Sequence, residues 1–207
     1  MNKKKIISHF EKVDKKIYKI IKKLNFNKWK KVIKKDKDYF SGLTRSIISQ
    51  QLSDKASSTI ISRFEKLFPN EKINPKHVLK LSDKKLRSVG MSFAKASFIK
   101  DLSHKYLNKE VDFKNIKKMS DEKVAEQLLQ VKGIGPWTVE MFLMFSLFRP
   151  NIFSHSDAGL KRAIKNLYGF KKEPSKSQVE KIVFKWHPYK TYGCFALWEI
   201  LDQPKKK

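Results

Sequence analysis

The sequence predicts an all-α fold, and three observations support this prediction. Glycine and proline, which interrupt helices, occur only seven times each in 207 residues. Apolar residues recur three and four positions apart, which is the spacing of the buried face of a helix. No segment alternates between apolar and polar residues as a half-buried strand does. The apolar fraction of 40%, with 15 Phe and 4 Trp, is sufficient for a hydrophobic core.

The first predicted element is one lysine-rich helix at the N-terminus. Residues 1–38 contain 15 Lys and 4 acidic residues, a net charge of 15 − 4 = +11. One apolar stripe at helical spacing runs through the segment and consists of Ile6, Phe10, Val13, Ile17, Ile20, Ile21 and Leu24. We therefore expect a single amphipathic helix here.

The later helices are predicted from their start signals as well as from their spacing. Ser53 or Asp54 can cap a helix over 53–68, and Ser120 followed by two acids opens a helix over 121–130. Pro136 stands where a first-turn proline is tolerated, which favours a helix over 136–148. The other predicted helices cover 39–51, short segments around 75–88, and then 93–108, 157–168, 176–186 and 189–202.

The composition points to a polyanionic partner inside the cell. Lys and Arg exceed the acids by 47 − 20 = +27, a charge that works against compactness unless a polyanion binds it. The alternative is that the lysines only keep the protein in solution, since they are spread along the whole chain. A membrane is not favoured, because the longest apolar run, residues 141–148, is far shorter than the ~20 residues of a spanning helix.

The N-terminus and the single cysteine exclude other classes. Only two apolar residues follow Lys3–Lys5, too few for the apolar region of a signal peptide, so we expect an intracellular protein of the cytoplasm, nucleoid or nucleus. Cys194 is the only cysteine, which excludes an internal disulfide, a four-cysteine zinc site and an iron–sulfur cluster.

A glycine-containing turn joins two predicted helices over residues 128–138. Gly133 and Gly135 flank Ile134, which can anchor the turn in the core, and the glycines leave backbone N–H groups uncovered at the start of the second helix. Such a hairpin can bind phosphate, so we expect Lys132, Gly133, Ile134 and Gly135 to contact a DNA backbone without reading its sequence. The same pattern also fits an ordinary connection between two helices.

Asp157 follows Gly135 by 22 residues and begins the next amphipathic helix. An isolated Asp in this place most often caps its helix, a task that Ser154 or Ser156 could share. His155 lies beside Asp157, but the sequence offers no second His or acid to complete a metal site or a triad. We therefore interpret His155 as a loop residue.

Three blocks, residues 46–53, 132–138 and 154–160, together resemble the helix-hairpin-helix (HhH-GPD) DNA glycosylase superfamily, in particular its 3-methyladenine DNA glycosylase II branch. The resemblance covers roughly residues 40–202. Ser154 and Ala158 depart from the family pattern, which often has Pro and an aliphatic residue there, and the N-terminal β-containing region of some relatives is absent.

The resemblance implies a domain organisation. Two helical lobes would enclose a cleft that binds DNA and the base, with the Lys-rich segment 1–38 packing with the C-terminal lobe. The glycosylase domain would cover 39–204, with its hairpin at 128–138 and its catalytic loop at 149–160. Residues 205–207 would form a basic tail.

The resemblance also implies site residues. Asp157 would be the catalytic carboxylate that stabilises an oxocarbenium-like sugar. Gln51 would wedge into the duplex where the damaged base is flipped out, although Gln50 and Gln51 could also be simple polar residues at a helix end, and Leu52 is the next candidate. The base pocket would contain Trp137, Met141 and Trp198.

Two further implications concern the chemistry. Trp137 stands where strand-cleaving members carry a Schiff-base Lys, so the chain is expected to be monofunctional. The carbonyls of Leu129, Val131 and Ile134 match positions that hold a Na⁺ or K⁺ ion in relatives, and no other cofactor is expected. Trp186, Tyr189 and Tyr192 are interpreted as core residues.

The function that the resemblance implies is hydrolytic release of alkylated purines, such as 3-methyladenine and 7-methylguanine, from duplex DNA as the first step of base excision repair. The partner would be duplex DNA containing damaged bases, without a membrane, and the chain would act as a monomer. The alternatives are a glycosylase for uracil, hypoxanthine or mispaired adenine, a non-catalytic DNA-binding protein and, more distantly, an RNA-binding protein. Relatives that excise oxidised pyrimidines or mispaired adenine usually carry a four-cysteine cluster, which this chain lacks.

Overall fold

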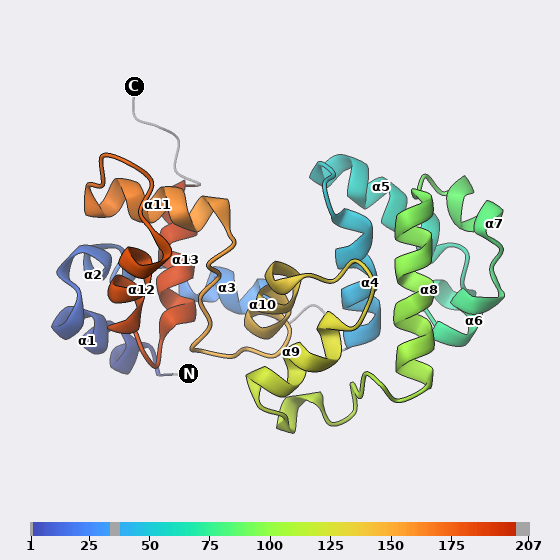
Figure 1. Ribbon diagram of the computed structural model, residues 1–207, viewed down its shortest axis with the longest axis horizontal. Helices are drawn as coiled ribbons and strands as arrows, with labels where there is room; N and C mark the ends of the chain where they lie inside the picture. The colour runs from blue at the N-terminus through green and yellow to red at the C-terminus, as the bar shows by residue number, and fades with distance from the viewer. Residues whose placement is uncertain (1, 34–37, 202–207) are drawn as a thin grey trace. The chain divides into compact units, whose positions relative to one another are not determined.

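The computed structural model describes residues 2–33 and 38–201, and within these ranges every regular element is a helix (Figure 1). The prediction of an all-α fold is therefore confirmed. The predicted basic tail, 205–207, lies outside the described residues. No helix in the described ranges is both long and apolar enough to cross a lipid bilayer.

The helices occur in the following order: α1 (Lys3–Val13), α2 (Lys15–Ile21), α3 (Phe26–Ile33), α4 (Tyr39–Ser49), α5 (Asp54–Glu65), η1 (Pro69–Glu71), α6 (Pro75–Lys80), α7 (Asp83–Ser88), α8 (Phe93–Leu107), η2 (Ile116–Lys118), α9 (Asp121–Leu129), α10 (Pro136–Phe145), α11 (Ala158–Tyr168), α12 (Lys176–Phe184) and α13 (Lys190–Leu201). Side chains cap many of these helices as their sequences predict. Ser53, rather than Asp54, caps α5, and Ser120 caps α9.

The chain divides into two compact units. The terminal unit consists of Met1–Lys35 together with Leu143–Lys207, and the central unit consists of Asp36–Phe142, so that the boundary falls within α10. In the terminal unit α13 packs against α2, α11 and α12; in the central unit α8 packs against α4, α6 and α7 (Figure 1).

The prediction of a single N-terminal helix is wrong. Asp14 has an extended backbone (φ −158°, ψ 95°) that ends α1, and its side chain accepts hydrogen bonds from the backbone N–H groups of Lys16 and Ile17 at the start of α2. Helical spacing alone missed this break because the apolar stripe continues across it. Buried residues on either side, Phe10 and Ile17, still belong to one core.

Asp14 also joins α2 to the C-terminal helices of its unit. Its second carboxylate oxygen accepts hydrogen bonds from the hydroxyl of Tyr168 at 2.6 Å and from the indole N–H of Trp186 at 3.0 Å. Trp186 is fully buried, as predicted, and its ring lies where a Cβ at Gly193 of α13 would sit, only 2.3 Å away. The N-terminal helices are therefore part of the core of the terminal unit.

Candidate DNA-binding and catalytic site

The turn between α9 and α10 has two glycines in different surroundings. Gly133 has φ +78°, and a Cβ added there would lie 2.1 Å from the ring of Phe98 in α8. A Cβ at Gly135 would meet no atom within 4 Å. Ile134, between them, is buried as expected. Gly133 is thus required for packing, while Gly135 keeps the outer side of the turn open.

The four residues predicted to contact phosphate are not equivalent. The amide N–H of Lys132 donates to the carboxylate of Asp101 in α8 at 2.8 Å, and that of Ile134 donates to the carbonyl of Val131 at 3.1 Å. Within the described part of the chain, the amides of Gly133 and Gly135 have no hydrogen-bond acceptor. Two glycine amides, rather than four successive amides, are therefore available to an anion.

The carbonyls around the turn also have partners. The carbonyl of Val131 accepts the Ile134 N–H, and that of Gly133 accepts a hydrogen bond from the side-chain amide of Gln50 at 2.8 Å. A carbonyl oxygen has two lone pairs, so the Val131 bond leaves one for a cation. Monovalent-cation binding by the carbonyls of Leu129, Val131 and Ile134 stays a prediction.

The Gln50–Gln51 turn follows α4 and carries the residue predicted as the wedge. Gln51 is exposed and has φ 56°, a left-handed conformation that is uncommon for a residue other than glycine. The ammonium group of Lys95 donates to the carbonyls of Ile48 and Gln50, both at 2.7 Å. Burial lowers the pKa of Lys95. Lys95 therefore holds the backbone of the turn, while the Gln51 side chain lies at the surface.

In the terminal unit, Asp157 is the N-cap of α11. One carboxylate oxygen accepts the backbone N–H of Leu160 at 2.7 Å and the indole N–H of Trp198 at 3.4 Å. A Cβ at Gly159 would lie 3.0 Å from the same oxygen. The capping role and the contact with Trp198 thus occur together, and Gly159 leaves room for both.

Trp198 belongs to a cluster of aromatic rings that also includes Trp29, Phe145 and Phe195. Trp198 stacks on Phe145 with ring centroids 5.8 Å apart, and Trp29 stacks on Phe195 at 4.2 Å with an angle of 3° between the rings. The indole N–H of Trp29 is buried without a hydrogen-bond partner among the described residues. Sequence reasoning missed Trp29 because no motif includes it and its partners lie more than 100 positions away.

Trp137 and Met141 lie one turn apart near the start of α10, in the central unit with the hairpin and Gln51. Trp137 is 43% exposed, so it is not a core tryptophan. Asp157 and Trp198 are in the terminal unit. The structure thus brings the predicted residues together in two groups, one in each unit.

His155 has an acidic partner that the sequence did not reveal. Its Nε2 lies 2.8 Å from a carboxylate oxygen of Glu180 in α12, and Lys190 approaches the other oxygen of Glu180 at 3.4 Å. His155 lies in the loop before α11, as interpreted, and what the sequence did not reveal is its contact with Glu180. Among the described residues, no cluster of His, Cys, Asp and Glu is arranged to hold a metal ion.

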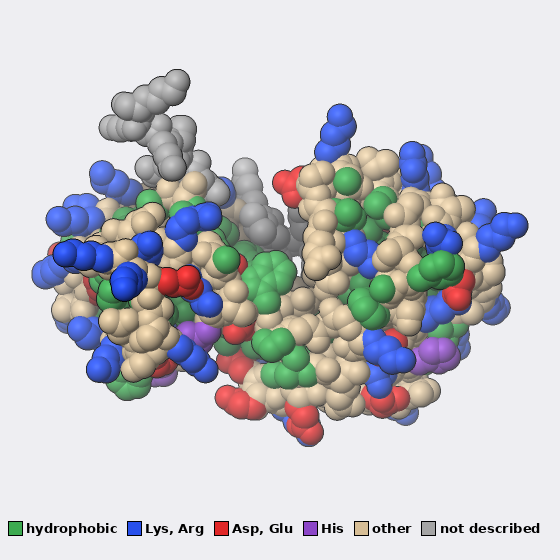
Figure 2. All heavy atoms as spheres, turned by 45° about the horizontal axis from the view of Figure 1, so that its top comes forward, with side chains coloured by type: hydrophobic (Ala, Val, Ile, Leu, Met, Phe, Trp, Pro, Cys, Tyr) green, Lys and Arg blue, Asp and Glu red, His purple; other side chains and the backbone are tan. Residues whose placement is uncertain are grey.

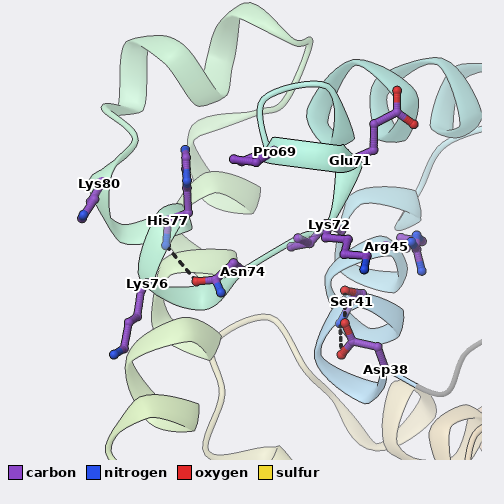
Figure 3. A pocket seen from close by; sticks show the side chains of 11 residues that line it. Asp38, Ser41, Arg45, Pro69, Glu71, Lys72, Asn74, Lys76, His77 and Lys80 are labelled. Atoms are coloured by element: carbon purple, nitrogen blue, oxygen red, sulfur yellow. Dashed lines mark hydrogen bonds between the residues drawn. The ribbon is translucent and has the colours of Figure 1, made fainter.

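A cavity of about 750 Å³ lies in the central unit at α4, η1 and α6 (Figure 3). Basic and acidic side chains both line it, among them Lys72, Lys76, Asp38 and Glu71. None of the predicted site residues lines this cavity. Lys and Arg side chains are spread over both units on the face drawn in Figure 2, as the composition predicts.

Comparison with known proteins identifies the family. Residues 44–188 match the model of the HhH-GPD superfamily of base excision DNA repair proteins. The alkylbase DNA glycosidase-like protein mag2 of Schizosaccharomyces pombe is 33% identical over 187 residues, which cover 84% of this chain and 88% of that protein. The structure of a DNA-3-methyladenine glycosidase from Bacillus halodurans is 31% identical, with a TM-score of 0.84 over 98% of this chain and 90% of that one.

A second solved structure extends the likeness of the fold. The 3-methyladenine DNA glycosylase Mag1 of Schizosaccharomyces pombe, solved in complex with abasic DNA, is 24% identical and has a TM-score of 0.77, covering 98% of this chain and 99% of that chain. The chain described here belongs to the HhH-GPD superfamily of base excision DNA repair proteins. Within that superfamily it is a DNA glycosylase, an N-glycosyl hydrolase.

Proposed function

We propose that this chain binds damaged duplex DNA and hydrolyses the N-glycosidic bond of flipped-out alkylated purines, such as 3-methyladenine and 7-methylguanine, with Asp157 as the catalytic carboxylate. The names of the relatives, alkylbase and 3-methyladenine glycosylases, support this substrate class. The observation that carries the catalytic assignment is the carboxylate of Asp157, held by two N–H donors from Leu160 and Trp198.

The chemistry of an alkylated purine suits a carboxylate acting alone. Alkylation at N3 or N7 places a positive charge on the base, which then leaves as a neutral molecule with the electron pair of the C1′–N bond. The sugar is left with oxocarbenium character at C1′, and a fixed negative charge beside it stabilises that state. The oxygen of a water molecule then bonds to C1′, and its proton is released to solvent.

The aromatic residues support a cationic substrate. An exposed indole face attracts a cation by ~0.5–2 kcal/mol, and Trp137 offers such a face. Met141 and Trp198 are our other candidates for the base pocket. An indole carries no nucleophilic amine, so Trp137 cannot form a Schiff base. This residue supports hydrolysis without strand cleavage.

The hairpin supports binding to the DNA backbone. The amides of Gly133 and Gly135 have no acceptor among the described residues and can donate to phosphate oxygens, and the excess of Lys and Arg adds attraction that does not depend on sequence. We expect one chain to act as a monomer, in the compartment that contains the cell's DNA. Light scattering of the protein with a short duplex would test the stoichiometry.

The test is to incubate the protein with alkylated DNA and to identify the released bases by chromatography. Asp157→Asn keeps an oxygen that can accept the Leu160 N–H, so the fold should survive, but we expect base release to fall by about 10²–10³-fold because the negative charge is lost. Asp38→Asn is a matched control, since Asp38 caps α4 in the same way.

Two results would contradict the proposal. Near-wild-type release by Asp157→Asn would end the catalytic assignment. Release of uracil or hypoxanthine from duplexes that contain those bases, with no alkylpurine released from alkylated DNA, would assign the same site to another lesion.

A further inference from the structure

One face of α8 contacts two turns of the central unit. They are the Gln50–Gln51 turn that follows α4 and the hairpin between α9 and α10. Lys95, Phe98 and Asp101 are spaced three residues apart and so lie along one side of the helix. Lys95 donates to the end of α4 and the Gln50 carbonyl, Phe98 fills the space beside Gly133, and Asp101 accepts the Lys132 N–H. We call these three residues the α8 support.

The two turns also contact each other directly. The side-chain amide of Gln50 donates to the carbonyl of Gly133 at 2.8 Å. The contacts therefore form a closed circuit: α8 to the Gln50–Gln51 turn through Lys95, that turn to the hairpin through Gln50, and the hairpin back to α8 through Asp101. In such a circuit neither turn can shift without breaking a contact of the other.

The charges of the α8 support do not suit a direct role on DNA. The ammonium of Lys95 is directed at two backbone carbonyls, and burial lowers its pKa. The Asp101 carboxylate would repel phosphate. It also accepts the hydrogen bond of the Lys132 N–H, which could otherwise donate to a phosphate oxygen. A cation and an anion so placed act on the protein backbone.

We propose that Lys95 and Asp101 are positioning residues for base flipping, which hold the Gln51 turn at a set distance from the hairpin. This inference rests on the proposed function and deepens it. When the glycine amides bind a phosphate, the Gln51 side chain is then already at the position where it can enter the duplex. Preorganisation matters because a displacement of about 1 Å can cost roughly 10²-fold in rate.

The first test replaces Lys95 by Met, which keeps the length of the side chain and removes its donors. We expect base release from a fully paired lesion to fall about tenfold or more, and release from a mispaired lesion to fall much less, because its unstacking is already easy. Lys100→Met is the matched control: it removes the same charge from the same helix, where Lys100 pairs with exposed Asp83. Lys95→Arg should restore part of the paired rate.

A double-mutant cycle separates positioning from general destabilisation. If Lys95 acts through Gln51, Lys95→Met should have little further effect on the paired lesion once Gln51 is Ala. A thermal melt accompanies each variant. Independent, multiplicative effects of the two substitutions, or equal slowing of paired and mispaired lesions, would overturn the proposal.

A readout without catalysis keeps this test separate from the proposed function. Fluorescence of 2-aminopurine beside a stable abasic analogue reports opening of the duplex, even if the wild-type chain releases no alkylpurine. We expect Lys95→Met and Asp101→Ala to reduce that opening, and Asp101→Ala also to speed hydrogen exchange of the Lys132 amide. Unchanged opening in both variants would refute the role of the α8 support. If the wild type opens the duplex but releases no alkylpurine, only the proposed substrate class is refuted.

Discussion

At Gly133, the left-handed φ of +78° and the ring of Phe98 leave no room for a side chain, whereas Gly135 has a negative φ and open space in front of it. A phosphate that accepts hydrogen bonds from both amide N–H groups must approach the turn from this open side. The first glycine therefore serves the fold of the hairpin, and the second serves access to its amides.

Substituting each glycine should separate these two roles. Gly133→Ala is expected to destabilise the protein by about 1–3 kcal/mol, because the new Cβ is strained in this conformation and meets Phe98. Gly135→Ala should melt at the same temperature as the wild type but bind every duplex more weakly. Its methyl group hinders the approach of a backbone phosphate, and this contact does not depend on the base sequence. Thermal melts and fluorescence anisotropy measure the two effects. Equal affinity of Gly135→Ala and wild type would show that the turn is only a connector.

How much of the candidate site could be predicted depends on how far apart the partners lie in the chain. The cap at Asp157 and the glycine turn are local, so short motifs are sufficient to predict them. Asp101 lies 31 positions from Lys132, and Glu180 lies 25 positions from His155. No spacing rule connects such pairs, because helix packing brings them together.

At the scale of helices, the join between α1 and α2 shows the same limit. Most of the helical stripe is buried, namely Ile6, Phe10, Ile17, Ile21 and Leu24, whereas Val13 and Ile20 are only half-buried. It did not predict the break at Asp14, since that residue is stabilised by Tyr168 and Trp186, more than 150 positions away. The helix was predicted from its periodicity, and its interruption depends on tertiary contacts.

The same contacts predict a loss of stability at alkaline pH. Burial, and then the hydrogen bond to Asp14, raise the pKa of Tyr168 far above its usual value. In the unfolded chain a tyrosine loses its proton near pH 10, so the stabilising contribution is complete below about pH 10 and is lost as the pH rises toward the folded-state pKa.

Urea unfolding between pH 10 and 11.5 tests this consequence. The free energy of unfolding of the wild type should fall more steeply with pH than that of Tyr168→Phe, by up to about 1.4 kcal/mol per pH unit. Tyr168→Phe itself should be less stable at pH 7, because Asp14 loses one donor. If the free energy of unfolding falls with pH at the same rate in both proteins, Tyr168 has the same pKa in the folded and the unfolded state.

At the scale of the whole molecule, the net charge of +27 should dominate binding to undamaged DNA. Affinity is expected to fall steeply with salt, with a slope of log K against log salt of about −0.9 for each phosphate neutralised. Gly135→Ala is an informative control: it removes an uncharged contact, so affinity should fall while the slope stays the same. Anisotropy titrations at several salt concentrations give the slope, and a flat response would assign the charge to some other purpose.

The division of the chain into units also has a consequence for its synthesis. The central unit is continuous, so all of its residues have been made before α11 begins, whereas the terminal unit combines the first three helices with the last three. On a ribosome adding about 5–20 residues per second, α1 and α2 wait on the order of ten seconds for α13. Throughout that interval Phe10 and Ile17 lack the partners that bury them, so the nascent chain should depend on chaperones most at its lysine-rich beginning.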